Sequence, residues 1–149
     1  MRRSMPSGVT LLELLVVLSA IGLLLGLSYS PIRRGLDQLA VDSARESLGA
    51  GLARARSIAI VRGGANLIVD LEGAAFWVES VGGDTLGGVT YLGARYGVEL
   101  TTVGAPADQV VLRFDRLGIG RLTNRTLRLE RGTARAHLAL SAYGRLRRW

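Results

Sequence analysis

The chain has 149 residues, which allows one small domain and an anchoring segment but not two full domains. It contains no cysteine, which excludes disulfide bonds, thiolate metal sites and a cysteine nucleophile. All positive side chains are arginines: residues 1–112 carry nine arginines and ten acids, and residues 113–149 carry ten arginines and two acids. The excess positive charge in the last quarter of the chain indicates either a polyanion partner or a solvated basic face.

The first predicted element is a membrane-spanning helix. Residues Leu14 to Ile32 run 19 positions without a charge, close to the ~20 residues that a helix needs to cross a hydrocarbon core. Arg2 and Arg3 precede the run and favour a cytoplasmic N-terminus, with the bulk of the chain outside. A secretory signal peptide has a shorter apolar core that ends in an Ala-x-Ala site, and no such site follows here.

Glu13 is the unusual residue of this segment, because it places a carboxylate among apolar side chains. A charge inside lipid costs roughly 2.5–3.5 kcal/mol on insertion scales and therefore needs a partner. A functional role is therefore the first interpretation of this residue. The alternative is that Glu13 marks the interfacial edge of the span, where a charge costs little.

The stretch Ser7-Gly8-Val9-Thr10-Leu11-Leu12-Glu13-Leu14 resembles the class III signal of type IV pilins and type II secretion pseudopilins. The resemblance implies that residues 1–8 are a leader, that prepilin peptidase cleaves after Gly8, and that the new N-terminus at Val9 is methylated. It also implies that Glu13 pairs with the free amine of a neighbouring subunit during assembly, when the subunit passes from the inner membrane into a filament. Val9 departs from the family, which usually has Phe or Met there.

A single long helix is expected over residues 9–62, with about 9–32 in the membrane. Pro31 is expected to interrupt or kink it, because proline lacks the N–H and clashes with the preceding turn. Beyond Pro31, Asp42 and Arg45 can pair at i,i+3, and Gly63-Gly64 ends the helix. Apolar residues at three- and four-residue spacing predict one covered face, formed by Leu36, Leu39, Ala40, Ala44, Leu48, Leu52, Ala55 and Ala59.

Residues 63–149 change to short β-rich runs broken by glycine, which predicts a small antiparallel sheet domain. Alternation of apolar and polar residues indicates half-buried strands, with a hairpin turn at Glu130–Thr133. The fold class is therefore α+β, a long N-terminal helix packed on a small antiparallel β-sheet domain. The expected strands are 66–72, 76–80, 89–92, 97–102, 110–114, 126–130 and 134–141.

This half resembles the FimT/GspH group of minor pilins and pseudopilins. The helix end at residues 53–60 and the final run from Phe114 through two strands to Tyr143-Gly144-Arg145 carry the likeness. With the N-terminal signal, it implies a pilin-like fold and a subunit of a type IV pilus or of a type II secretion pseudopilus.

The sequence offers no constellation typical of an enzyme, and neither a cofactor nor a metal is expected. His137, the only histidine, lies on an alternating strand beside Arg135, as an exposed sheet residue would. Asp70, Glu72 and Glu79 fall on or near the first two strands, but their spacing fixes no metal cage.

The arginine-rich C-terminus is the second informative segment. Gly144-Arg145-Leu146-Arg147 resembles the GRxR tail motif of FimT-like minor pilins implicated in DNA uptake, with Tyr143 and Trp149 available to stack on bases. Two alternatives remain: a structural or assembly role without DNA, and a pseudopilin of type II secretion. The predicted contacts to double-stranded DNA are Arg145, Arg147, Arg148, Arg121, Arg125, Arg128, Arg131 and Arg135.

Overall fold

The computed structural model describes residues 8–121, 124–141 and 146–148, and only the backbone of residues 27–30 and 146–148. Its internal contacts divide the chain into two units, the first ending at Gly35 and the second beginning at Leu36. The first unit consists of the N-terminal part of helix α1 (Leu11–Arg62). The second contains the rest of α1 and two β-sheets.

The first unit is an apolar helix with every described side chain from residue 8 to 26 exposed. Helix α1 is the one described helix that is long and apolar enough to cross a membrane. The helical backbone continues through Pro31, so this proline does not interrupt the helix, and of the two expected effects only a kink stays a prediction. Proline removes one backbone hydrogen bond, and helices in membranes tolerate that loss where other polar groups or a local backbone adjustment satisfy the freed carbonyl.

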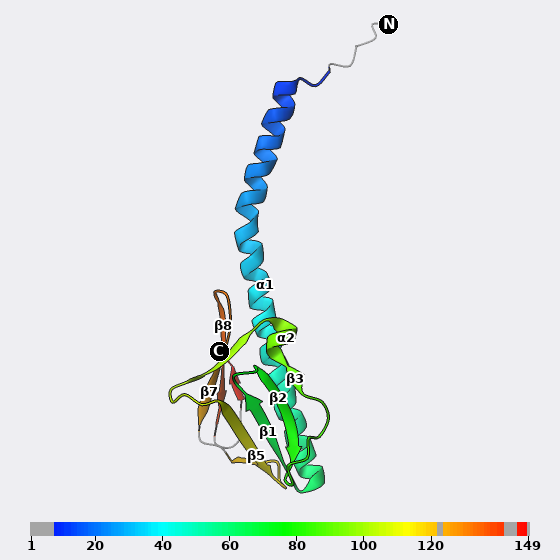
Figure 1. Cartoon of the computed structure of the whole chain (residues 1–149), viewed down its shortest axis with the longest axis vertical. Coiled ribbons are helices and arrows are strands. Elements are labelled where there is room, and N and C mark those ends of the chain that lie inside the picture. Colours follow the sequence, from blue (N-terminus) through cyan, green and yellow to red (C-terminus); the bar gives the residue numbers. More distant parts are fainter. Residues whose placement is uncertain (1–7, 122–123, 142–145, 149) are drawn as a thin grey trace. The chain divides into compact units, whose positions relative to one another are not determined.

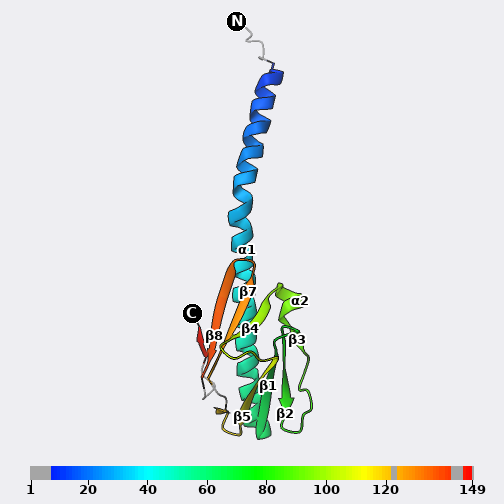
Figure 2. The ribbon, with the colours of Figure 1, turned by 60° about the vertical axis from the view of Figure 1, so that its left-hand side comes forward.

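In the second unit, α1 buries one face against both sheets (Figures 1 and 2). The buried residues recur at helical spacing, as predicted, but the face begins at Val41 rather than at Leu36. Leu36 and Leu39 are 57% and 65% exposed, so their expected burial was wrong. Periodicity finds the apolar stripe but does not say where the sheets begin to cover it. The face consists of Val41, Ala44, Leu48, Leu52, Ala55 and Ala59.

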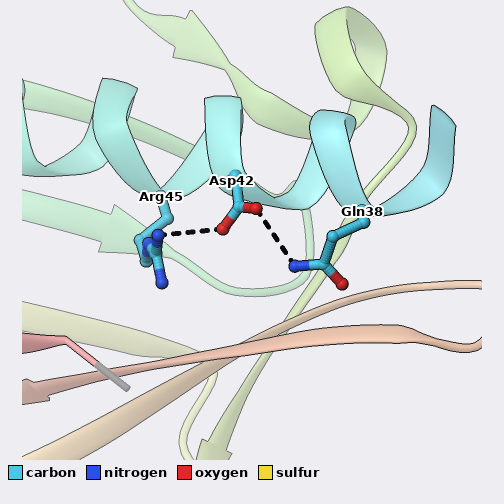
Figure 3. A network of polar contacts seen from close by, with 3 residues as sticks. All are labelled: Gln38, Asp42 and Arg45. Carbon is cyan, nitrogen blue, oxygen red and sulfur yellow. Dashed lines mark hydrogen bonds and ion pairs between the residues drawn. The ribbon is translucent and has the colours of Figure 1, made fainter. Parts of the chain in front are cut away.

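The polar side of this helix segment carries a short network (Figure 3). The predicted pair is confirmed, because Arg45 Nη2 lies 2.9 Å from Asp42 Oδ1. Gln38 adds a hydrogen bond from Nε2 to Asp42 Oδ2 at 3.1 Å. Such i,i+3 and i,i+4 contacts each add a few tenths of a kcal/mol, roughly 0.2–0.5, to helix stability.

The two sheets are antiparallel throughout. The first has the order β3-β2-β1-β5-β6, and its strands are β1 (Gly64–Asp70), β2 (Ala75–Ser80), β3 (Thr90–Tyr91), β5 (Gln109–Asp115) and β6 (Gly120–Arg121). The second has the order β4-β7-β8-β9, and its strands are β4 (Glu99–Val103), β7 (Arg125–Arg131), β8 (Ala134–Leu140) and β9 (Leu146–Arg148).

The alternation read from the sequence is confirmed on the long strands. Val110, Leu112 and Phe114 of β5 are 1–3% exposed and pack into the core, as do Leu127 and Leu129 of β7. The hairpin turn is also confirmed: Arg131 pairs with Ala134 across a two-residue loop, in which Gly132 has φ +57°. A positive φ at this position is readily adopted by glycine.

Three short elements were not expected. Residues predicted as a strand at 89–92 form only Thr90–Tyr91 and then the helix α2 (Leu92–Tyr96), which buries Leu92 completely. Strand β6 has two residues and β9 has three. Such short strands show no period, because alternation requires at least four residues to be recognised.

Candidate functional site

The start of α1 places Gly8, Val9 and Thr10 before the first helical turn, and all three are exposed. Thr10 caps the helix: its Oγ1 accepts the N–H of Glu13 at 3.2 Å, and its carbonyl accepts the N–H of Leu14 at 3.1 Å. Thr10 and Glu13 have the Thr-x-x-Glu spacing of a capping box, a signal that the sequence reading missed. Glu13 thus sits in the first turn, where the helix dipole favours a negative charge.

The carboxylate of Glu13 has no ion-pair or hydrogen-bond partner among the described residues. The side chains around it are apolar and exposed, including Val9 at 70% and Leu12 at 74%. The arrangement is a single anion at the tip of an uncovered apolar helix. A carboxylate in apolar surroundings costs free energy unless a cation compensates it, and the described part of the chain supplies none.

Two of the predicted basic residues share one acid on the outer face of β7 and β8. Glu130 Oε1 lies 2.8 Å from Arg135 Nε and 4.0 Å from Arg128 Nη1. The strand register explains the grouping, because Glu130 pairs with Arg135 and Arg128 pairs with His137. Residues directly opposite on neighbouring strands project from the same face. This face therefore carries two guanidinium groups, one histidine and two carboxylates, because Glu99 of β4 lies directly opposite Glu130.

Two further predicted residues, Arg131 and Arg125, form contacts within the domain. Arg131 Nε lies 3.0 Å from Asp37 Oδ1 on α1, and Arg131 Nη1 donates a short hydrogen bond to the carbonyl of Tyr96. Arg125 Nη1 donates to the carbonyl of Ala105 at 3.3 Å. Both arginines alternate in phase with the buried residues of β7, at either end of the strand. They are thus set apart from the outer face that carries Arg128.

The remaining predicted contacts lie elsewhere. Arg121 belongs to β6 of the other sheet, directly opposite Arg113 of β5. Arg145 lies outside the described residues. The backbones of Arg147 and Arg148 lie in β9, opposite Ala139 and Leu138 of β8. The described arginines therefore fall into separate groups on two sheets rather than one face.

Two of the three acids considered for metal binding, Asp70 and Glu79, form local hydrogen bonds. Asp70 Oδ2 accepts the N–H of Gly73 at 3.2 Å, and Glu79 Oε1 accepts the indole N–H of Trp77 at 2.7 Å. Across the described part of the chain, no three His, Cys, Asp or Glu side chains gather closely enough to hold a metal ion. His137 is half-buried on the outer face of β8.

Comparisons with known proteins give the fold. No protein-family model matches the sequence. No curated protein matches it either. Among solved structures, the chain is similar to the type IV minor pilin FimU of Pseudomonas aeruginosa, with a TM-score of 0.55 and 23% identity over 73% of this chain and 87% of that one. It is also similar to the minor pseudopilin EpsH from the type 2 secretion system of Vibrio cholerae, with a TM-score of 0.53 and 18% identity over 73% of this chain and 95% of that one. The chain has a type IV pilin-like α+β fold.

Proposed function

We propose that this chain, which has a type IV pilin-like fold, is a minor subunit of a type IV pilus. In this proposal prepilin peptidase removes residues 1–8, and methylation follows at Val9. The mature subunit waits in the inner membrane as a single-pass protein with its sheet domain outside. It then joins other pilin subunits in the pilus through its helix.

The observation that carries the proposal is the uncovered apolar helix with one carboxylate near its tip. Its described side chains from residue 8 to 26 are all exposed, and Glu13 lacks an ionic partner in the described chain. Lipid can cover such a helix before assembly, and helices of neighbouring subunits can cover it afterwards. The ammonium of Val9 in a neighbouring subunit then provides the cation for Glu13, so both charges are compensated in a low-dielectric setting.

We further propose that the subunit binds extracellular DNA for natural transformation through its basic C-terminal region. The supporting observation is the charge of residues 113–149, which hold ten arginines and two acids. Arginine forms bidentate contacts with phosphates, and such binding is independent of sequence and weakens as salt rises. Arg145, Arg147 and Arg148 are the main proposed contacts, and Arg128 of β7 and Arg135 of β8 belong to the same sheet as β9.

A second candidate is a minor pseudopilin of type II secretion that binds no DNA. The similarity to the pseudopilin EpsH, over 95% of that chain, favours it. In this case the sheet domain contacts other pseudopilins, and the arginines pair with acids on those partners. Deletion of the gene, with transformation, piliation and secretion assayed together, separates the two functions.

Processing and DNA binding each have a direct test. Mass spectrometry of the native protein is expected to find a methylated N-terminus at Val9, and an intact Met1 or a cut near Ser30 would contradict a pilin.

A gel-shift titration of the full chain in neutral detergent is expected to show DNA binding that weakens with salt. Unchanged binding by the Arg145→Gln plus Arg147→Gln variant would exclude the tail as the main contact.

A further inference from the structure

Two arginines face each other across the last hairpin of the first sheet. Arg113 of β5 is directly opposite Arg121 of β6, and both side chains are exposed. Like charges in directly opposed cross-strand positions repel and destabilise a sheet. Arg116, also exposed, lies in the connection between the two strands. Arg113, Arg116 and Arg121 are the hairpin arginines.

In the described residues, neither Asp115 nor Glu79 forms an ion pair with the hairpin arginines. Asp115 Oδ1 accepts the backbone N–H groups of Leu117 and Ile119, both at 2.9 Å, and so shapes the turn. Glu79 lies at the far end of the same cross-strand row, beyond Asn66, and accepts the indole N–H of Trp77. Within the described residues no ion pair or hydrogen bond reaches any of the three guanidinium groups.

The hairpin is held firmly against α1. Gly118 has φ +70° and is buried, and a Cβ at this position would come within 2.8 Å of Arg56 Cγ and 3.1 Å of Ile60. The ring of Phe114 on β5 lies under the Arg56 guanidinium, with 5.9 Å between the charge and the ring centroid. A fixed backbone presents its cations without further loss of conformational freedom, which favours binding of an anion.

From these observations we infer that the hairpin arginines form a phosphate-binding site for the backbone of a nucleic acid, separate from the C-terminal tail. A phosphodiester between Arg113 and Arg121 replaces their repulsion with two charge-assisted contacts. The choice of DNA as the source of the phosphate rests on the proposed function.

A second copy of this chain is a poorer partner for the site. Most carboxylates of the second unit already bind side chains or backbone N–H groups, and among the described residues only the carboxylates of Glu72, Glu99 and Asp108 have neither kind of partner. The same part of the chain leaves five exposed arginines without a partner, which are Arg54, Arg62, Arg113, Arg116 and Arg121. Self-association would therefore bring more cations than anions to the hairpin.

The test compares the full chain in neutral detergent with the Arg113→Gln plus Arg121→Gln variant, using a labelled DNA duplex across a salt series. Loss of two phosphate contacts reduces the slope of log K against log salt by about 1.8, so between 50 and 200 mM salt the parent loses about tenfold more affinity than the variant. Arg54→Gln plus Arg95→Gln removes the same charge from other exposed positions, and its slope is expected to stay near that of the parent.

The outcomes separate this inference from the proposed function. If the parent binds DNA and the hairpin variant keeps the same slope, the site is overturned while DNA binding by the tail stands. If the parent does not bind DNA, both fail. Normal DNA binding with loss of filament incorporation by the hairpin variant would assign the arginines to a protein contact and overturn the nucleic-acid site.

A measurement without DNA tests the repulsion itself and shows that the variants fold. At low ionic strength Arg121→Gln is expected to raise the Tm by about 1–5 °C, because it removes one of two opposed charges. Inorganic phosphate should raise the Tm of the parent and close this gap. A lower Tm for Arg121→Gln, or no response of the parent to phosphate, would contradict the inference.

Discussion

Asp37 and Arg131 join the central helix to the tip of a hairpin that lies 94 residues further along the chain: the Oδ1 of Asp37 is 3.0 Å from the Nε of Arg131. The Asp37 side chain is 14% exposed and that of Arg131 is 39% exposed, so the pair is partly shielded from water. Arg131 also donates to the carbonyl of Tyr96 at the end of α2. One guanidinium group thus links α1, α2 and the β7–β8 hairpin.

Replacement of Arg131 by Gln is therefore expected to lower stability more than DNA affinity. The variant loses the ion pair and the bond to Tyr96, which should reduce the free energy of unfolding by about 1–2 kcal/mol after allowance for solvent screening. Thermal unfolding followed by tryptophan fluorescence measures the loss. Arg135→Gln is the control, because its exposed pair with Glu130 contributes less than about 1 kcal/mol. Equal loss in the two variants would contradict the linking role.

Gly51 of α1 packs closely against Phe76 of β2. A Cβ at this position would overlap the ring of Phe76. Gly51→Ala gains about 1 kcal/mol in helix propensity, but the overlap costs roughly 1–3 kcal/mol, so the Tm should fall or at best stay level. Gly35→Ala, where nothing lies within 4 Å of the new Cβ, should not lower the Tm. A clear rise for Gly51→Ala would show that Phe76 moves aside without cost.

Leu39 and Leu48 lie on the same helix, but we expect substitution of Leu48 to lower folding stability and substitution of Leu39 to lower incorporation into filaments. Leu48 is 1% exposed, and its replacement by Ala should cost about 2–5 kcal/mol of unfolding free energy. Leu39 is 65% exposed, and Leu39→Gln should change subunit stability by less than about 0.5 kcal/mol. If neighbouring subunits cover Leu39, the Gln variant should nevertheless enter filaments poorly. Immunoblots of sheared filaments measure incorporation, and normal incorporation would place Leu39 outside the contact.

Variants of Glu13 and Thr10 distinguish a role in filament assembly from a role in capping the helix. Glu13→Gln keeps the size of the side chain and removes the charge, so membrane insertion should continue while incorporation into filaments falls. Thr10→Ala removes the cap at a cost of about 0.5–2 kcal/mol to the helix start but leaves the carboxylate in place. Filament yield, compared with the amount of processed subunit in the membrane, measures both. Equal defects would indicate that Glu13 acts through the helix start rather than through a partner cation.

The sequence predicted most of the long elements because their signals are local. Apolar spacing along the helix and strict alternation on β5, β7 and β8 each repeat often enough to be recognised. The errors occurred where tertiary packing, rather than local sequence, determines burial and strand formation. Leu36 and Leu39 continue the apolar stripe of the helix, yet the sheets cover it only from Val41. Strands β6 and β9 are too short to show a pattern at all.

The arginines illustrate the same limit for the candidate sites. Their number and clustering in the sequence indicated a polyanion partner, but not which guanidinium groups are free. Pairing depends on acids far away in the chain, as Arg131 and Asp37 show. Conversely, Arg113 was not among the predicted DNA contacts, because its position opposite Arg121 depends on the strand register. The Thr10 cap, in contrast, was readable from the spacing to Glu13.

The short strand β9 affects how the C-terminus can be altered in an experiment. Its backbone pairs with β8 at three positions, from Leu146 opposite Leu140 to Arg148 opposite Leu138. A truncation that removes the tail would remove its charges and also uncover the edge of β8, and an uncovered edge invites pairing between molecules. Aggregation of a truncated protein could then be mistaken for a loss of ligand binding. Side-chain substitutions leave this edge paired, and an affinity tag is better placed away from Trp149.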